Sequence, residues 1–175
     1  VLFVDRVSVC TAAVAWTVQQ RYHVACQEKE REMMDVLATH SSLVSAIARF
    51  DKENSQDAHE LGSAAATISQ VVDAHNHKHG FGETGEFFMV KGEGNEINFL
   101  ISDRHTGKVA PLLMDAPYAD VFRRAILGQS GVVVTRDIDS RKKIIAAYNY
   151  VQELDVGLVV TVTLAEVRQP FVTAA

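Results

Sequence analysis

Three histidines at alternate positions, His75, His77 and His79, form a group of potential metal ligands. His75 and His79 are four residues apart, so their imidazoles would lie on one face of a helix, where imidazole nitrogens can bind zinc. No cysteine or second histidine pair stands nearby in the sequence. Basic side chains are also favoured at the C-terminal end of a helix by its dipole. A zinc site and a solvated helix end both fit the pattern, and we expect the helix end and no bound metal.

A second group with binding chemistry is Asp103-Arg104-His105, which follows a run of strand-forming residues. The planar guanidinium of Arg104 can hold a carboxylate through two parallel hydrogen bonds, so Arg104 is a candidate ligand contact. The alternative is a surface loop with local ion pairs. Tyr148 and Tyr150 are two positions apart in a predicted strand and therefore share a face. Tyr148 either lines a pocket or belongs to an ordinary core.

We find no pattern of residues that indicates catalysis. Ser130 and Ser140 lie outside any Gly-x-Ser-x-Gly context, and no glycine-rich stretch matches a phosphate loop or a dinucleotide fingerprint. In the glycine-bearing segment Gly92-Glu-Gly-Asn95, an acidic residue would repel phosphate. We therefore expect that this segment is not an enzyme and needs no cofactor.

Composition and charge exclude several classes of protein. The chain has 175 residues, of which 47% are hydrophobic and only 3 are proline, so it has enough apolar side chains to form a core. Its 17 basic and 22 acidic residues give a net charge of −5, with no run of five basic residues, so we do not expect nucleic-acid binding. Cys10 and Cys26 are sixteen residues apart in one predicted helix, too far for an intrachain disulfide.

Two helices are predicted in the first part of the chain. The segment Gln19–Phe50 contains no glycine or proline, and its apolar residues recur at helical spacing. This spacing places on one face Met33, Val36, Leu37, Val44, Ile47 and Phe50. The polar stretch Asp51–Asp57 predicts a break, and a second helix follows through Leu61 and Val72 to Gly80.

The uncharged segment Val7–Gln19 precedes this long helix. The uncharged run is shorter than the roughly 20 residues that span a membrane. It is either the outer end of a membrane helix or a buried helix. The chain begins with Val1 instead of Met, and we take it as an excised segment.

The remainder of the chain is dominated by strand patterns. Glu86–Lys91 and Glu96–Ser102 are joined by a predicted hairpin turn at 92–95. A loop over 103–115 and a short helix at Tyr118–Leu127 follow. Three further strands are predicted at 131–137, 143–151 and 157–164, and a helix leaves the domain from Glu166. Because the strands are grouped and the helices lie outside the group, we expect an α+β fold with a five-stranded antiparallel sheet.

Four blocks in this order resemble the extracytoplasmic Cache sensor domains, in which a long N-terminal helix precedes a PAS-like sheet and two membrane helices flank the domain. The resemblance covers about Gln27 to Phe171. The blocks are Gly80–Phe87 (GFGETGEF), Arg123–Gly131 (RRAILGQSG), Ile145–Val151 (IAAYNYV) and Leu154–Val160 (LDVGLVV). The longer Tyr/Arg/Trp/Tyr/Asp pattern of the amine-sensing and amino-acid-sensing members is absent, since Trp16 in the first helix is the only tryptophan.

The resemblance implies three segments: helices at 1–80, a PAS-like sensor subdomain at 81–164 and an exit helix at 165–175. It also implies that a carboxylate, amino acid or amine binds between the sheet and the elements that cover it. By position, the candidate ligand-binding residues are Arg104, Tyr118, Arg123, Asp137, Tyr148 and Tyr150.

These expectations lead to one hypothesis about function, with an alternative. The hypothesis is a periplasmic or extracellular input domain of a membrane receptor, paired as a homodimer through the long helix. The output module outside these residues would be a histidine kinase, a diguanylate cyclase, an adenylate or guanylate cyclase, or a chemoreceptor. We favour the kinase and the nucleotide cyclases over the chemoreceptor. The alternative is a ligand-free structural dimerisation module, or spacer, with a filled interior beside Tyr148.

Overall fold

The computed structural model describes residues 2–54, 83–101 and 110–172 of the chain. Several predictions lie outside these ranges. They are the second helix, the histidines His75, His77 and His79, and the group Asp103-Arg104-His105.

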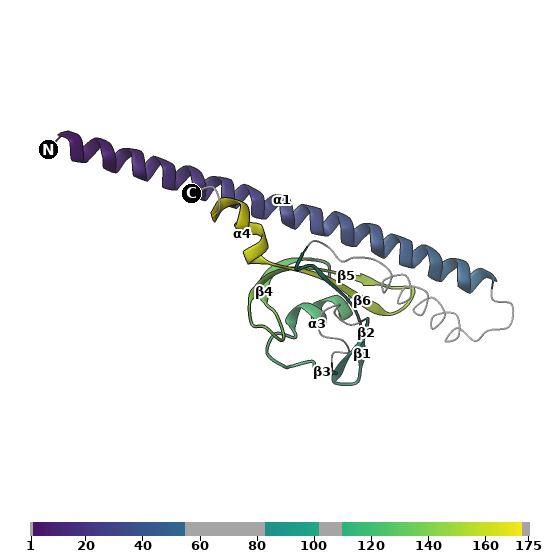
Figure 1. The fold of residues 1–175 in the computed structure, drawn as a ribbon. Helices are drawn as coiled ribbons and strands as arrows, with labels where there is room; N and C mark the ends of the chain where they lie inside the picture. The colour runs from purple at the N-terminus through teal and green to yellow at the C-terminus, as the bar shows by residue number, and fades with distance from the viewer. Residues whose placement is uncertain (1, 55–82, 102–109, 173–175) are drawn as a thin grey trace.

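The first element is a single helix of 53 residues, α1 (Leu2–Asn54), which runs the length of the molecule in Figure 1. It extends beyond the predicted span at both ends, because no glycine or proline interrupts the sequence before Gly62. The buried side chains Met33, Leu37 and Val44 confirm the predicted core face. Phe50, which the spacing also placed on that face, is 64% exposed.

The N-terminal part of α1 projects beyond the sheet. Val14 and Trp16 are 64% and 67% exposed, so the part of this segment whose side chains the structure describes, residues 12–19, is not buried within the chain as one alternative predicted. Within the residues that the structure describes, no helix combines the length and the apolar character needed to cross a membrane. Cys26 is a free cysteine and lies in the same helix as Cys10.

The strands form one antiparallel sheet in the order β3-β2-β1-β6-β5-β4, which confirms the α+β class. Every neighbouring pair of strands is antiparallel. The sheet has six strands instead of five, because two residues of the predicted loop pair with β2 at one edge. The strands are β1 (Glu86–Glu93), β2 (Glu96–Ile101), β3 (Leu112–Leu113), β4 (Gly131–Arg136), β5 (Lys143–Val151) and β6 (Val156–Thr163).

The two faces of the sheet have different covers. Alternate residues of a strand point to opposite faces, so β5 directs Ile145 and Ala147 to one side and Ala146 and Tyr148 to the other. The first side packs against α1, in an apolar core that includes Leu37. The second side packs against the short helix α3 (Asp120–Ile126), which contacts β1, β5 and β6. We call these the α1 face and the α3 face.

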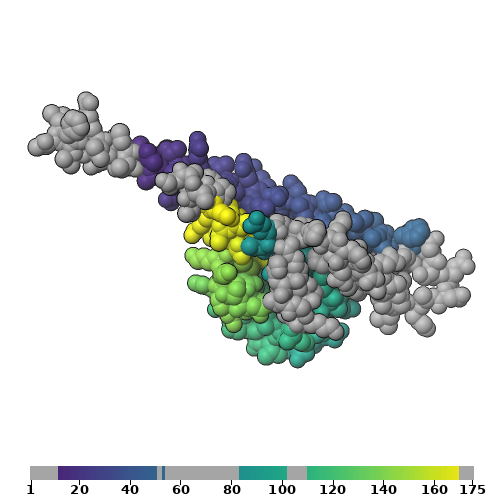
Figure 2. Space-filling model, in the orientation of Figure 1, coloured from purple at the N-terminus to yellow at the C-terminus, as the bar shows by residue number. Residues whose placement is uncertain are grey.

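The last helix, α4 (Leu164–Val172), continues directly from β6 and lies beside α1 (Figures 1 and 2). It begins two residues before the predicted start at Glu166. The Arg168 side chain joins the two helices, since its Nε donates a 2.9 Å hydrogen bond to the Tyr22 hydroxyl. The guanidinium also stacks over the Tyr22 ring, 5.1 Å from its centre. The helix that follows the last strand, α4, therefore packs beside the first helix, α1.

Candidate ligand-binding site

A hollow of about 220 Å³ lies on the α3 face, at the end of the sheet that α3 does not cover. Its position follows from strand alternation, because Glu86 is two residues from Phe88 and Thr161 two residues from Val159, both of which pack on the α3 side. The turn between β4 and β5 supplies another wall. We call this the polar hollow, lined by Glu83, Thr84, Glu86, Asp137, Asp139, Ser140, Lys142, Ile144, Thr161 and Thr163.

The lining of the polar hollow is strongly acidic. Four of the lining residues are carboxylic acids, and Lys142 is the one basic residue among those that the structure describes there. Within the described ranges, no three His, Cys, Asp or Glu side chains are grouped so that they could hold a metal ion. The charge of the polar hollow therefore fits an organic cation better than an anion.

Thr161 places a buried hydroxyl against the polar hollow. Its side chain is only 3% exposed, and its hydroxyl has no hydrogen-bond partner among the described residues. Among the described residues, every side-chain nitrogen or oxygen that is fully closed from solvent has a hydrogen-bond partner. Because the Thr161 hydroxyl has none, it is not fully closed from solvent and must face the open space of the polar hollow. A hydroxyl that faces the polar hollow and bonds no other described residue is available to hydrogen-bond a bound molecule.

Asp137 contributes to the polar hollow from the turn between β4 and β5. Its Oδ1 accepts hydrogen bonds from the Asp139 backbone N–H (3.1 Å), the Ser140 backbone N–H (2.6 Å) and the Ser140 hydroxyl (2.7 Å). These bonds all use one carboxylate oxygen, so one oxygen fixes the turn. The structure describes five of the predicted site residues, and of these five Asp137 is the one that lines the polar hollow.

Tyr118 and Arg141 form a contact between two turns. Both residues have positive φ angles, 73° and 58°, which is uncommon for residues with a side chain. The Arg141 guanidinium lies 4.2 Å from the centre of the Tyr118 ring. Because Arg141 stands between Ser140 and Lys142, this contact joins the turn before α3 to the turn that walls the polar hollow. Tyr118 itself does not line the polar hollow as the structure describes it.

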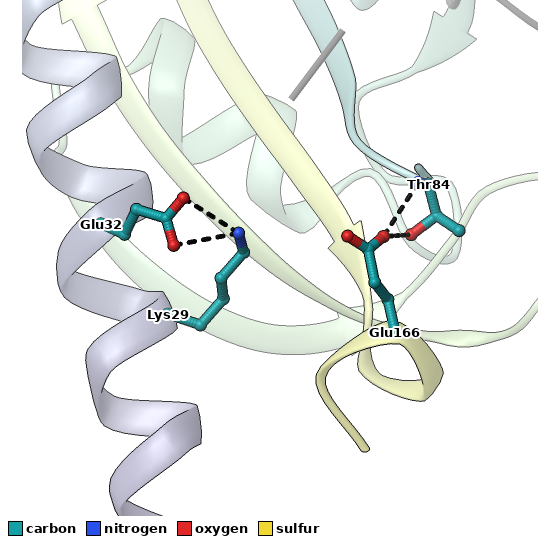
Figure 3. Close-up of polar contacts among 4 residues, drawn as sticks. All are labelled: Lys29, Glu32, Thr84 and Glu166. Carbon is teal, nitrogen blue, oxygen red and sulfur yellow. Dashed lines mark hydrogen bonds and ion pairs between the residues drawn. The ribbon is translucent and has the colours of Figure 1, made fainter. Parts of the chain in front are cut away.

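Thr84 and Glu166 connect the polar hollow to α4 (Figure 3). The Glu166 carboxylate accepts hydrogen bonds from the Thr84 backbone N–H at 2.9 Å and from the Thr84 hydroxyl at 2.5 Å. Burial raises the pKa of Glu166, but hydrogen bonds from Thr84 and from the Glu83 backbone, with the charge of Lys29, outweigh it. The net pKa of Glu166 is lower than usual, so this carboxylate is held in its charged form.

Arg123 and Tyr148 lie by α3, away from the lining of the polar hollow. Arg123 pairs with Asp120 at 2.5 Å and donates to the Met114 carbonyl at 3.2 Å. Tyr148 is 6% exposed in the core of the α3 face. Arg124 donates to its hydroxyl, and this bond together with the charge of Asp120 raises the pKa of Arg124. Both predicted residues are thus engaged within the domain.

Tyr150 also has a local partner. Its hydroxyl donates a 2.7 Å hydrogen bond to Asp155, which lies at the turn before β6. This bond, with burial and the charge of Asp155, raises the pKa of Tyr150. The structure therefore does not bring Tyr118, Arg123, Tyr148 and Tyr150 together around one hollow, and their role as ligand contacts stays a prediction.

Sequence reasoning missed Thr84, Glu86, Thr161 and Thr163. Two signals point to them. Glu86 precedes Phe88 and Val90 on one face of its strand, and Thr161 and Thr163 follow Val159 on one face of theirs, so in both strands polar and apolar residues share a face. The sequence Thr163-Leu-Ala-Glu166 is a capping-box pattern, typical of the first turn of a helix. Neither signal indicates that these residues lie side by side, because that depends on strand pairing.

The comparisons with known proteins give partial likenesses. No protein-family model matches this chain, and no curated protein matches it. The chain is similar to the extracellular domain of mmHK1S-Z3, a protein assigned as a histidine kinase, with 22% identity and a TM-score of 0.43 over 61% of this chain and 39% of that one. It is also similar to the ligand-binding domain of the Campylobacter jejuni chemoreceptor Tlp3 in complex with L-valine, with 13% identity and a TM-score of 0.43 over 92% of this chain and 65% of that one. The chain thus spans less than two thirds of either matched structure, and neither of these is a catalytic domain.

Proposed function

We propose that this chain is the input domain of a membrane signal-transduction receptor, and that it binds a small molecule with an ammonium group in the polar hollow. The observation that carries the proposal is the polar hollow itself. It combines four carboxylic acids with the partnerless Thr161 hydroxyl, on a sheet that continues directly into α4.

The chemistry of the polar hollow supports an amine or an amino acid over a carboxylate alone. An ammonium group donates hydrogen bonds and carries positive charge, so it complements both the acids and the free acceptor positions of Thr161. Lys142 offers a single position for the carboxylate of an amino acid. The volume of about 220 Å³ favours a small metabolite, since pockets for drug-sized ligands are usually larger, roughly 300 to 1,000 Å³.

The arrangement of the two terminal helices supports a receptor. α1 and α4 lie side by side, and Arg168 and Tyr22 join them. A ligand that prefers one of two arrangements of these helices would pass its effect along both of them. In the proposal the domain lies outside the cell membrane, between two membrane helices. A kinase, nucleotide cyclase or chemoreceptor output module would lie elsewhere in the receptor.

We also propose that α1 pairs with α1 of a second copy. The exposed apolar residues Val14, Val18 and Leu43 support this pairing. At about 100° per residue they fall within about 40° of one another around the helix axis. This side is about a third of a turn away from the side that buries Leu37, so α1 can hold the sheet and a partner helix at once.

Thermal unfolding of the chain with matched small molecules tests the ligand class. We would use n-propylamine, L-alanine and butyrate, which offer an ammonium group, both charges and a carboxylate. A ligand at 100 times its Kd stabilises the folded state by about 2.7 kcal/mol, which is a rise of about 5–10 °C in Tm for a chain of this size. We expect the rise with the amine and the amino acid, and none with butyrate.

Asp137→Asn is the matched variant, because the asparagine keeps the Oδ1 acceptor that fixes the turn and removes the charge. We expect it to abolish most of the rise. Asp115→Asn is the control, since Asp115 is exposed and does not line the polar hollow as described. A rise with butyrate alone, or equal rises in both variants, would contradict the proposed ligand class.

A ligand-free spacer remains the second candidate, and one observation favours it. The surroundings of Tyr148 are filled, as that alternative predicts, since Tyr148 is 6% exposed and packs in an apolar core. The polar hollow at the other end of the same face distinguishes the two. No rise with any of the small molecules would favour the spacer.

A further inference from the structure

We infer that Thr84 is the positioning residue through which an occupant of the polar hollow acts on α4. This inference rests on the proposed function, because it takes the polar hollow as the binding site. Thr84 lines the polar hollow and also completes the hydrogen bonds at the start of α4.

The start of α4 departs from an ordinary capping box. In that motif the glutamate three residues after the capping threonine reaches back to the backbone N–H of that threonine. Here the Thr163 N–H donates instead to the Thr84 hydroxyl, at 3.1 Å, and Glu166 accepts from Thr84. The Glu166 N–H donates to the Thr163 hydroxyl at 3.4 Å, as a cap requires. A residue 79 positions away in the sequence is therefore inserted into the cap of α4.

The Thr84 hydroxyl has no further hydrogen-bonding capacity. It holds one proton, which goes to the Glu166 carboxylate at 2.5 Å. The 2.9 Å contact with the Thr163 hydroxyl must then use the Thr163 proton, so Thr84 accepts there and also accepts from the Thr163 N–H. One donated and two accepted bonds saturate a hydroxyl. An occupant that donates to Thr84 must displace one of the bonds that hold α4.

The start of α4 also lies near a positive charge on α1. The charge of Lys29 contributes to the low pKa of Glu166, while the Lys29 ammonium itself pairs with Glu32 at 3.0 Å (Figure 3). About one turn along α4, Arg168 contacts Tyr22 of α1. A change in the first turn of α4 therefore reaches the contact between the two helices that leave the sheet.

The direction of the effect follows from the chemistry of the occupant. An ammonium group donates hydrogen bonds but accepts none. Near Thr84 it competes with the Thr163 donors for the hydroxyl oxygen and attracts the Glu166 carboxylate. Either contact loosens the cap, so an ammonium group in the polar hollow opens the first turn of α4. A neutral group of similar size that cannot donate leaves the cap in place.

A tethered ammonium group tests this coupling without any knowledge of the natural ligand. In the chain with Cys10→Ala and Cys26→Ala, Asp139→Cys places a thiol on the wall of the polar hollow. Reaction with 2-aminoethyl methanethiosulfonate attaches an aminoethyl group through a disulfide and releases methanesulfinate. Methyl methanethiosulfonate attaches a neutral methylthio group as the control. The measurement is hydrogen exchange of the Thr163 and Glu166 backbone amides, whose N–H groups form the bonds of this cap.

We expect the ammonium group, but not the methylthio group, to speed this exchange about fivefold or more, the lower end of usual coupling between sites. Thr84→Val removes the hydroxyl, so we expect the two labels to differ less than about twofold in that background. Thr84→Ser keeps the hydroxyl and should restore the difference. Thr135→Val removes a threonine hydroxyl outside the described lining of the polar hollow and should leave the difference unchanged.

The outcomes separate this inference from the ligand class proposed above. Equal responses to the two labels with Thr84 present, or the same difference in Thr84→Val, would overturn the inference. If free amines do not bind but the tethered ammonium loosens α4 through Thr84, the inference holds and the ligand class is wrong. If free amines bind and α4 exchange does not respond to the tethered group, the site stands and the inference is overturned.

Discussion

Among the described residues, each face of the sheet buries one polar side chain, and the two side chains differ in their partners. On the α1 face, Ser41 is 7% exposed and its hydroxyl accepts a 3.0 Å hydrogen bond from Asn149. On the α3 face, Thr161 is 3% exposed and has no partner among the described residues. The Ser41 hydroxyl is satisfied within the chain, whereas the Thr161 hydroxyl faces the open space of the polar hollow. The α1 face thus uses its buried hydroxyl to hold the fold together, and the α3 face leaves one that a ligand can reach.

Strand β6 shows where this difference begins. Its residues on the α1 face, Leu158, Val160 and Val162, are apolar along the whole strand. On the α3 face the strand changes from Gly157 and Val159 beneath α3 to Thr161 and Thr163 in the polar hollow. α3 is only seven residues long, so it covers the apolar end and leaves the polar end open. Because α3 is short, the α3 face has an apolar core at one end and the polar hollow at the other.

The largest expected effect is on the α1 face. Leu37 is fully buried between α1 and the sheet. We expect Leu37→Ala to lower the free energy of unfolding by about 3 kcal/mol, because it removes apolar contacts and leaves a cavity. Val24→Ala is the control, since Val24 is 50% exposed on the same helix and is not among the residues proposed for helix pairing. Chemical denaturation measures both, and equal losses would contradict the described packing of α1.

Gly157 tests how closely α3 packs on the other face. A Cβ at this position would lie 2.7 Å from the Ala125 Cβ and 3.1 Å from the Ile126 backbone nitrogen. We expect Gly157→Ala to cost about 2 kcal/mol, because α3 must move away from the sheet. Gly94→Ala has open space around it but a φ of +61°, so it should cost only about 1 kcal/mol of backbone strain. A smaller loss for Gly157→Ala than for Gly94→Ala would argue against close packing of α3.

Matched substitutions of the two buried hydroxyls should differ in their effect on stability. Ser41→Ala leaves the Asn149 side-chain amide without its Ser41 acceptor, so we expect a loss of about 1 kcal/mol. Thr161→Val removes a hydroxyl that faces the polar hollow and bonds no other described residue, so we expect a change of less than about 0.5 kcal/mol. The same Thr161→Val variant should bind n-propylamine more weakly. Equal losses of stability in thermal unfolding would contradict this difference between the two hydroxyls.

The smallest expected effect is the acid dependence that comes from Glu166. Its pKa in the folded chain is lower than in the unfolded chain, so its contribution to stability is complete above the unfolded pKa. This contribution is lost as the pH falls from about 5 towards 3, when the unfolded chain binds the proton first. Glu166→Gln keeps an acceptor oxygen and should lose less stability over this range. Thr84→Val removes one of the hydrogen bonds that lower the pKa of Glu166, so it should also lose less stability between these pH values. Identical pH profiles for the unmodified chain and the two variants would contradict the described contact between Thr84 and Glu166.

Much of the fold followed from local patterns in the sequence. The strand boundaries of β1, β2, β4, β5 and β6 lie within two residues of those predicted, because residue alternation and turn signals act within a strand or a hairpin. The glycine turn between β1 and β2 is confirmed, with Gly94 at a φ of +61°. The two-residue strand β3 was missed, since it is too short for any periodic pattern and exists through pairing with β2.

The candidate site was less predictable. Asp137 lines the polar hollow, whereas the structure gives Arg123 and Tyr150 local partners in Asp120 and Asp155. Those partners are three and five residues away in the sequence, and a charged or hydroxyl side chain does not indicate by its type whether such a neighbour will satisfy it. A role in ligand binding for those two residues stays a prediction.

The sequence by itself determined the long helix, five of the six strands, the two sides of each of these strands and the capping pattern at Thr163 and Glu166, because these depend on residues that are close in the chain. Only the tertiary structure decided that Thr84, Asp137 and Thr161 share one hollow, and that Thr84 enters the cap of α4. The physical reason is that strand order and the length of α3 set which parts of a face are covered. These depend on contacts between residues far apart in the chain, which no local pattern records.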